Sequence, residues 1–321
     1  MGDIIMSLNW GIIGTGTIAN EMAASLLAHQ QPAMAVTARD QAKLTAFAEQ
    51  YQIPKTYETV ADLLADETID AVYIATPHNT HFDFIKQALA HHKHVLAEKA
   101  ITVSNEEYTI VRKLAQDAGL VLLEAMTPVH MPLFKRLREL INQGSLGQIK
   151  VINTTFGSHK PYDPKNRFFN PDLAGGALLD IGGYATQASV YFMNSTPSRA
   201  NSMMVPFETG VDEQSVTILA NDNHEMATIT LSMQAKQPKA ITISGTKGYL
   251  RIPDFPRADA AIWYHTDTGE SEAIALGNSA DALWYEISDF EQAVQDPKIA
   301  LEFTNLTGMQ FETLSKIQQA W

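Results

Sequence analysis

The sequence predicts a doubly wound parallel α/β sheet, followed by a second domain with a mainly antiparallel sheet. Three observations support this fold class. Short apolar runs alternate with helical patterns through the first 125 residues, which is typical of a parallel sheet covered by helices on both faces. A glycine-rich turn joins the first strand to the first helix. After about residue 126, segments with a period of two replace this alternation, as in an antiparallel sheet with one covered face.

Five strands and four helices are expected in the first part. The strands are 8–13, 33–38, 71–75, 94–98 and 120–124. Between them, apolar residues recur at helical spacing and predict helices at 18–26, 41–51, 82–89 and 104–118. Since a chain of 321 residues usually forms two domains, we expect one domain at residues 1–126 and another at 127–321.

In the second part, the clearest element is a strand with one apolar face. Ala227, Ile229, Leu231 and Met233 point one way, and Thr228, Thr230 and Ser232 point the other. A helix is expected at 133–141 before Gly144, a strand around 241–243 and a closing helix at 283–294.

The composition restricts the function classes. Asp and Glu outnumber Lys and Arg by 36 to 23, and a net charge of −13 repels phosphate backbones, so no nucleic-acid partner is expected. Cysteine is absent, which excludes disulfides, thiolate catalysis and Cys-ligated metals and fits a reducing compartment. No apolar stretch reaches the length of a membrane span, and residues 1–7 lack the pattern of an export signal. A cytoplasmic protein without membrane contact is therefore expected.

The turn after the first strand has the pattern G-x-G-x-x-A, in which Gly14 and Gly16 are the glycines. The first glycine permits a tight turn. The second lets a pyrophosphate approach the helix N-terminus, where the N–H groups of residues such as Thr17 and Ile18 favour anions. A plain strand–helix turn is the alternative, but the position between a strand and a helix favours a dinucleotide site.

The end of the second strand bears on the choice of cofactor. Sites for NAD place an acidic residue about 20 residues after the glycines, whereas this strand ends at Ala38 and Arg39 follows. A guanidinium suits the 2′-phosphate of NADP, so NADP(H) is expected to be preferred over NAD(H). The alternative is a solvated surface arginine, and we interpret Asp40 as the N-cap of the next helix.

Two further groups have the residue types of an active site. Glu98 and Lys99 end the fourth strand, at the edge where ligands bind in open α/β sheets. Asp180 and Tyr184 lie four residues apart in a glycine-rich segment that begins a helix, so they share a face. The glycines suggest that a nicotinamide or a facing helix packs against the backbone. An exposed lysine and a core helix with a satisfied tyrosine are the alternatives.

Together and in this order, these segments resemble the Gfo/Idh/MocA family of NAD(P)-dependent oxidoreductases, and most of all its branch of dihydrodiol and D-xylose dehydrogenases. The resemblance covers nearly the whole chain, at residues 10–19, 35–40, 73–81 (YIATPHNTH), 94–99, 124–126, 175–184 and 245–248. It implies an N-terminal Rossmann domain and a C-terminal α+β domain with an open sheet for substrate binding and dimerisation. A homodimer or a dimer of dimers is therefore expected.

The resemblance also implies residue roles. Tyr184 corresponds to the catalytic acid/base, Lys99 to the lysine that contacts nicotinamide ribose or substrate, and Asp180 to the other member of the family's D-x-x-x-[HY] pair. An ammonium nearby makes a tyrosine hydroxyl more acidic, so this assignment is chemically coherent. Cofactor contacts are expected from Gly14, Gly16, Thr17, Ile18, Arg39, Thr76, Pro77, Asn79, His81, Glu98 and Lys99, with a helix cap as the alternative for His81.

Two departures from the family pattern concern the substrate. The usual E-K-P reads Glu98-Lys99-Ala100, and the branch's E-A-x-W-T-R reads EAMTPV at 124–129. An aromatic wall and a basic group of the pocket are therefore missing. Thr127 and Arg167 are kept as substrate contacts, with a surface salt bridge as the alternative for Arg167. The histidines at 91, 92 and 94 fall between a helix and a strand, so no metal site is expected.

The expected function is an NADP(H)-dependent oxidoreductase that transfers hydride between the nicotinamide and a small sugar, polyol or related alcohol/carbonyl substrate. One alternative is a non-catalytic dinucleotide-binding sensor or scaffold of the same fold. Another is an enzyme that uses the nucleotide transiently to eliminate or hydrolyse a glycoside.

Overall fold

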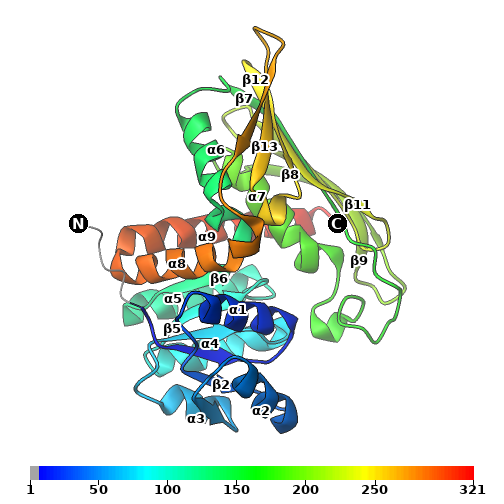
Figure 1. Cartoon of the computed structure of the whole chain (residues 1–321). Helices are drawn as coiled ribbons and strands as arrows, with labels where there is room; N and C mark the ends of the chain where they lie inside the picture. The colour runs from blue at the N-terminus through cyan, green and yellow to red at the C-terminus, as the bar shows by residue number, and fades with distance from the viewer. Residues whose placement is uncertain (1–6) are drawn as a thin grey trace, which may run out of the picture. The chain divides into compact units, whose positions relative to one another are not determined.

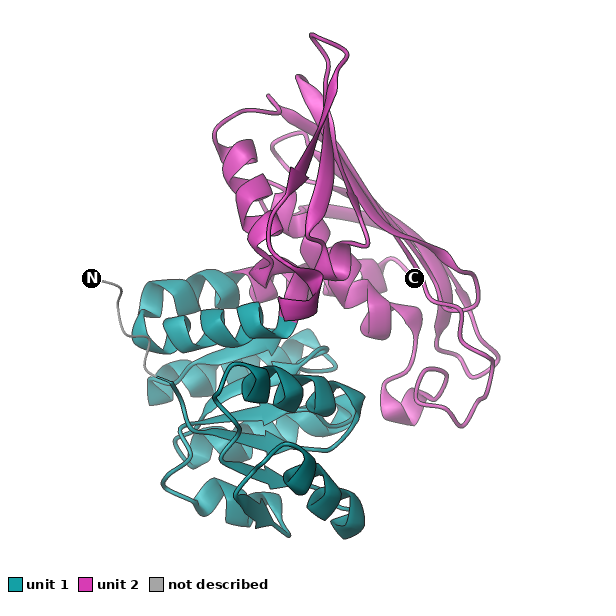
Figure 2. Ribbon diagram, viewed as in Figure 1, with its two compact units in different colours: residues 1–125, 283–305 teal, residues 126–282, 306–321 magenta. Residues whose placement is uncertain are grey.

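The computed structural model describes residues 7–321, so the expectation that residues 1–7 carry no export signal lies, apart from residue 7, outside this range. The chain divides into two compact units (Figures 1 and 2). The first comprises residues 1–125 and 283–305, and the second comprises 126–282 and 306–321. The boundary expected after residue 126 does not include this return of residues 283–305 to the first unit.

The first unit contains a six-stranded sheet with the order β3-β2-β1-β4-β5-β6, and every pairing is parallel. This confirms the doubly wound sheet. The strands are β1 (Trp10–Ile13), β2 (Ala35–Thr37), β3 (Lys55–Tyr57), β4 (Ala71–Ile74), β5 (His94–Glu98) and β6 (Leu122–Ala125). The helices are α1 (Thr17–Ala28), α2 (Gln41–Gln50), α3 (Val60–Ala65), α4 (His81–Ala90), α5 (Asn105–Ala118) and α8 (Ala282–Gln295).

Both faces of β1 are covered. Trp10 and Ile12 belong to a core that includes Met22 of α1, Phe47 of α2 and Phe290 of α8. On the other face, a Cβ at Gly11 would lie 2.9 Å from the side chain of Leu63 in α3. All four residues of β1 are buried, which explains why the strand is apolar throughout rather than alternating.

Helix α8 is fastened to the first unit by a buried carboxylate. Oε1 of Glu291 accepts hydrogen bonds from the main-chain N–H of Leu8 and the indole N–H of Trp10, both at 3.2 Å. It also accepts one from the side chain of Gln31. A buried carboxylate is stable only with such donors, so these bonds tie α8 to the start of β1 and explain the return of the chain.

The second unit is built on an eight-stranded sheet with the order β14-β13-β12-β11-β7-β10-β9-β8. Only the β7–β10 pair is parallel, so the expected, mainly antiparallel sheet is confirmed. The strands are β7 (Ile149–Gly157), β8 (Arg199–Pro206), β9 (Asp212–Ala220), β10 (Met226–Ser232), β11 (Gln237–Gly245), β12 (Gly248–Pro253), β13 (Ala260–His265) and β14 (Ser271–Ala275). Helix α6 (Pro132–Asn142) matches the expected helix, and α7 (Gly183–Phe192) packs on β7 and β10.

The alternation in β10 matches its burial, with one exception. Ala227, Ile229 and Leu231 are buried, whereas Thr228 and Thr230 are half-exposed on the other face. Ser232 was expected on that face but is buried, because its hydroxyl accepts the N–H of Ala235 at 2.9 Å in the turn after the strand. The open face carries exposed apolar side chains on β8, β9 and β10, namely Met203, Val205, Val216, Ile218 and Met226.

The chain ends in a helix that the sequence did not predict. Helix α9 (Pro297–Gln319) comes after the closing helix expected at 283–294. No helix within residues 7–321 is both long enough and apolar enough to cross a membrane.

Candidate active site

The glycine turn after β1 is held in place from both sides. Gly14 has φ +112° and donates its N–H to the carbonyl of Thr37 at the end of β2 (2.9 Å). A Cβ on Gly14 would lie 2.6 Å from the carbonyl oxygen of Ala75, so only glycine fits. Gly16 is the N-cap of α1 without a side-chain cap, and a Cβ there would meet nothing within 4 Å. The N-terminus of α1, with Thr17 and Ile18, is therefore open to an anion.

At the end of β2, the two charged residues have different environments. Arg39 is exposed. Asp40 is the N-cap of α2, and its carboxylate accepts the N–H of Lys43 at 3.1 Å. The interpretation of Asp40 as a cap is confirmed, and its carboxylate is engaged by the helix. Arg39 remains the residue at this edge with the chemistry for a phosphate.

The loop after β4 is built around His81. Its Nδ1 lies 2.9 Å from the carbonyl oxygen of Ala100, and its Nε2 lies 2.8 Å from that of Thr76. Burial lowers the pKa of His81, whereas the two carbonyls act in the opposite direction. Both ring nitrogens of His81 thus contact main-chain carbonyls. His81 joins this loop to the segment after Lys99, and neither nitrogen is offered to a ligand. Pro77 and Asn79 lie exposed in the same loop.

The end of β5 is fixed by two buried glutamates. Glu98 accepts a hydrogen bond from the hydroxyl of Tyr73 and another from the N–H of Lys99 at 3.2 Å. Glu124 in β6 accepts the N–H of Ile101 at 3.1 Å. Glu98 therefore acts on the main chain beside Lys99, and its expected direct contact with the cofactor stays a prediction.

These loops share one edge of the sheet. Gly14, Arg39, Thr76 and Lys99 follow β1, β2, β4 and β5, which are parallel and adjacent. The strand order reverses between β1 and β4, and this is where dinucleotides bind in doubly wound sheets. The open space at Gly16 and the uncapped start of α1 fit a pyrophosphate.

The second unit carries the Asp–Tyr pair. Asp180 lies in a π-helical turn, Leu178–Gly182, and Tyr184 lies in the first turn of α7. The segment is thus wider than the α-helix that the sequence predicted, and such turns are frequent at functional sites. Asp180 is buried, and Arg167 donates to its carboxylate at 3.4 Å. Tyr184 is half-buried, and its ring centre lies 6.2 Å from that of Phe156.

The glycines of this segment contact protein groups. A Cβ on Gly182 would lie 2.9 Å from Leu231 of β10, and one on Gly183 would lie 3.5 Å from Gln310 of α9. Close packing against β10 accounts for Gly182, whereas the contact at Gly183 is of ordinary length and does not require a glycine.

A buried aspartate that the sequence did not reveal holds the start of this segment. Asp212, the first residue of β9, accepts the N–H of Leu178 at 2.7 Å. Gly176 has φ +111°, and a Cβ there would lie 2.2 Å from Oδ1 of Asp212. Burial raises the pKa of Asp212 to about 7, although hydrogen bonds from main-chain N–H groups partly oppose this. Asp212 therefore acts as a cap supplied by a neighbouring strand.

The two expected substrate contacts differ. The hydroxyl of Thr127 donates to the carbonyl of Pro256 at 2.9 Å, and Thr127 is buried, so the structure uses it for packing. Arg167 is exposed apart from its bond to Asp180, and its guanidinium lies 4.1 Å from the centre of the Phe168 ring. Arg167 therefore lies beside the Asp–Tyr pair in an ion pair with Asp180, which fits both the expected substrate contact and the salt-bridge alternative.

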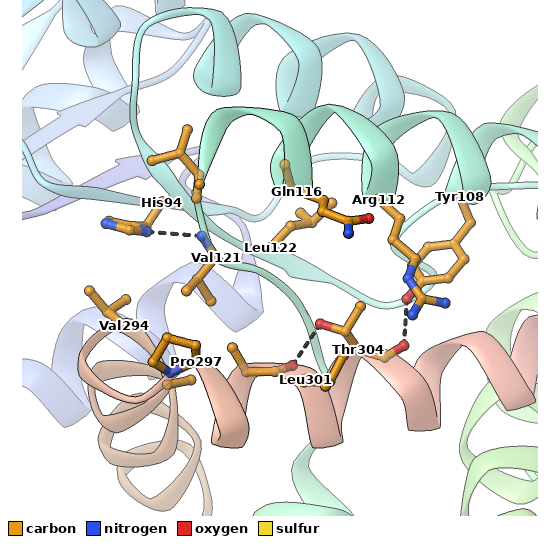
Figure 3. A pocket seen from close by; sticks show the side chains of 15 residues that line it. His94, Tyr108, Arg112, Gln116, Val121, Leu122, Val294, Pro297, Leu301 and Thr304 are labelled. Atoms are coloured by element: carbon orange, nitrogen blue, oxygen red, sulfur yellow. Dashed lines mark hydrogen bonds between the residues drawn. The ribbon is translucent and has the colours of Figure 1, made fainter.

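A cavity of about 350 Å³ lies elsewhere in the first unit (Figure 3). It is lined by α5, α8, α9 and the residues before β6, and Tyr108 at its wall donates to the carbonyl of Thr304 at 2.9 Å. His94, at the start of β5, accepts the N–H of Val121 at 3.0 Å, so the cavity is at the edge of the sheet opposite the glycine turn. Within residues 7–321, no cluster of three His, Asp or Glu side chains could hold a metal.

The doubly wound sheet and its open glycine turn are typical of dinucleotide-binding Rossmann folds, and the family comparison assigns the chain to oxidoreductases with this fold. The model of the oxidoreductase family with this fold matches residues 8–126, and that of the GFO/IDH/MocA C-terminal domain matches residues 134–251. The chain belongs to the Gfo/Idh/MocA family of NAD(P)-binding oxidoreductases.

Named relatives span most of the chain. Trans-1,2-dihydrobenzene-1,2-diol dehydrogenase of Xenopus laevis is 33% identical over 78% of this chain and 76% of its own. D-xylose 1-dehydrogenase (NADP(+)) 2 of Haloferax volcanii is 33% identical over 89% of each chain. The 3-ketoreductase KijD10 of Actinomadura kijaniata, solved with NADP and TDP-benzene, shares the fold with a TM-score of 0.87 at 22% identity over 98% of each chain.

The protonation of Asp212 predicts a pH-dependent stability. Its pKa in the folded state is raised from 3.8 to about 7, so the folded protein holds this proton more tightly than the unfolded chain. The protonated Asp212 contributes fully to the stability of the folded protein below pH 3.8, and this contribution is lost as the pH rises to about 7. Since Asp212→Asn cannot ionise, its unfolding free energy relative to wild type should rise by about 3 kcal/mol from pH 5 to pH 8.

Urea unfolding at several pH values measures this difference. Asp267→Asn, at an exposed turn, is the matched control and should show no pH trend. A constant difference between Asp212→Asn and wild type would mean that Asp212 keeps one protonation state throughout.

Proposed function

We propose that the protein is an NADP(H)-dependent oxidoreductase that transfers hydride between the nicotinamide and a carbon of a sugar, polyol or related alcohol/carbonyl substrate. The observation that carries the proposal is the open glycine turn beside Arg39, at the edge of the sheet that also bears Lys99. Relatives of at least 30% identity act as dehydrogenases of a dihydrodiol and of D-xylose by name, which supports the substrate class.

The residues of the first unit account for cofactor binding. The N–H groups at the start of α1 would hold the pyrophosphate, and Gly14 and Gly16 give it room. Arg39 would bind the 2′-phosphate. Because the carboxylate of Asp40 caps α2, it would not bind the ribose hydroxyls in competition with the phosphate. The loop containing Thr76 would bind the nicotinamide half of the cofactor. Lys99, whose main chain is anchored by Glu98, would bind the same half. When bound, the nicotinamide supplies or accepts the hydride.

The residues of the second unit account for the proton. The hydroxyl of Tyr184 would give a proton to the substrate oxygen in reduction and take it in oxidation. Asp180 and Arg167, which are bonded to each other, would orient the substrate hydroxyls. Lys99 is assigned to nicotinamide ribose or substrate by the family resemblance. Removing the Tyr184 hydroxyl should leave the binding of the nucleotide intact, because none of the proposed nucleotide contacts involves it.

Tyr184→Phe should lower turnover by about 10²-fold or more, the usual scale of general acid/base catalysis, with cofactor affinity nearly unchanged. Steady-state rates from nicotinamide absorbance and titration of NADPH fluorescence measure the two effects. Tyr249→Phe, an exposed tyrosine of β12, is the control and should retain activity. If the turnover of Tyr184→Phe equals that of the wild type, Tyr184 has a packing role and is not the acid/base.

Arg39 should determine the preference for NADPH. A charge-assisted contact with the 2′-phosphate contributes roughly 1.5–3 kcal/mol, so NADPH should bind about 10- to 150-fold tighter than NADH. Arg39→Ala should remove this difference by weakening NADPH alone, while Arg136→Ala, on the exposed face of α6, should change neither affinity. The proposal is rejected by equal wild-type affinities or by an Arg39→Ala variant that weakens both cofactors alike.

The open face of the second sheet is proposed as the interface of a homodimer or a dimer of dimers. It exposes a row of apolar side chains on β8 to β10, and contiguous apolar surface of this kind marks interfaces. Ile218→Asp on this face should yield a monomer in sedimentation equilibrium, whereas Ile110→Asp on the exposed side of α5 should not. A wild-type chain that sediments as a monomer at micromolar concentration rejects the proposal. The cytoplasmic location stays a prediction.

A further inference from the structure

Positive charge is concentrated beside the Asp–Tyr pair in a chain that is otherwise acidic. Five of the 23 Lys and Arg residues fall in two short segments, the loop 158–170 and residues 233–239, which run into the start of β11; together they contain one acidic residue, Asp163. We call these the basic loops. Both lie at the same end of the second sheet (Figure 1), and the N–H of Lys160 donates to the carbonyl of Met233 at 2.9 Å. The two segments therefore form one basic surface.

Three cations of this surface are held by aromatic rings. The Lys160 Nζ lies 4.7 Å from the centre of the Phe168 ring, and the Arg167 guanidinium lies 4.1 Å from the same centre. The Lys239 Nζ lies 5.2 Å from the ring of Phe156. Lys160 and Lys239 are half-buried, so the rings fix the positions of charges that solvated surface lysines would leave mobile.

The same contacts connect these cations to the site. Arg167 bonds to Asp180, and the Phe156 ring that carries Lys239 faces Tyr184 with ring centres 6.2 Å apart. Asp180 pairs with Arg167, and Glu208, in the loop before β9, accepts the hydroxyl of Tyr162 at 2.5 Å. The five Lys and Arg residues of the basic loops outnumber the carboxylates of Asp163, Asp180 and Glu208, so this surface keeps an excess of positive charge.

This arrangement has an electrostatic cost that an anion would relieve. Two cations on one aromatic ring repel each other, and the attraction of each cation to the ring offsets this repulsion only in part. A fixed excess of positive charge raises the local concentration of anionic ligands. A guanidinium next to an ammonium also supplies the charge-assisted donors that carboxylates and phosphates bind best.

We propose that the substrate carries an anionic group, a carboxylate or a phosphate, which Lys160, Arg167 and Lys239 bind beside the hydroxyl or carbonyl served by Tyr184. The reaction part of this inference rests on the proposed function, whereas the binding part does not. An anionic substrate differs from the neutral diol and pentose in the names of the relatives.

Isothermal titration of the NADPH-loaded protein with matched ligands tests the inference. Each neutral sugar is paired with its anionic counterparts: glucose with glucuronate and glucose 6-phosphate, and xylose with xylonate and xylose 5-phosphate. At least one anionic member should bind tenfold or more tightly than its neutral parent, the scale of one charge-assisted contact. Comparing the two kinds of anion identifies the preferred group.

Two variants and a control locate the contact. Lys160→Met and Lys239→Met keep an apolar chain on the ring but remove the charge, so each should weaken the anionic ligand about tenfold and leave its neutral parent unchanged. Lys165→Met, at an exposed lysine of the same loop, should change neither affinity. Circular dichroism confirms that the variants fold.

The inference is overturned if no anionic ligand in the panel binds better than its parent, or if the advantage survives in both Lys160→Met and Lys239→Met. Failure of the proposed function looks different. Anion-selective binding without any hydride transfer would reject the oxidoreductase assignment and keep the anion site. Turnover of neutral sugars without anion-selective binding would keep the oxidoreductase assignment and reject the anion site.

Discussion

The central position of β1 in its sheet is the constraint on which the dinucleotide edge depends. Because β1 pairs with β2 on one side and β4 on the other, the connections that leave β1 and β4 pass over opposite faces of the sheet, which is the arrangement at which ligands bind in doubly wound sheets. The two turns nevertheless approach closely where they leave the sheet, since a Cβ on Gly14 would lie 2.6 Å from the carbonyl of Ala75. Any side chain there would push the turn after β1 away from the loop of Thr76 and His81.

Buried carboxylates position the proposed catalytic groups in both units. In the first unit, Glu98 and Glu124 accept the N–H groups of Lys99 and Ile101 and thereby fix the main chain on either side of Ala100. In the second unit, Asp212 accepts the N–H that begins the turn bearing Asp180. In each case an acidic residue of a strand accepts a main-chain N–H next to a proposed catalytic side chain. Part of the acidity of the chain therefore has a structural role.

Hydrophobic periodicity and glycine chemistry account for the parts of the fold that the sequence predicted. The alternation of strands and helices indicated the first sheet, and the period of two in 227–233 indicated the covered face of the second. Neither β3 nor α3 was predicted, because three partly exposed residues and a six-residue helix are too short for a period to show. The return of α8 to the first unit depends on Glu291, whose partners lie more than 250 residues away. Asp212 escaped prediction for the same reason, since its contact with the main-chain N–H of Leu178, 34 residues away, leaves no local pattern. The contacts of His81 with the carbonyls of Thr76 and Ala100 are closer in sequence, but main-chain partners carry no residue-type signal either.

The structure also explains how this chain departs from its branch on the substrate side. The segment 124–129 lacks the aromatic and basic residues of the family pattern, and here it is committed to packing: Val129 is buried, and Thr127 donates to the carbonyl of Pro256. Cations appear instead on the basic loops, where Phe168 and Phe156 hold them near Asp180 and Tyr184. Under the proposed anion site, these cations would take the place of the basic group that the family pattern has in the segment after β6. Loops tolerate such changes because the strands that support them keep their register, so the proposed change in substrate charge would leave the second sheet intact.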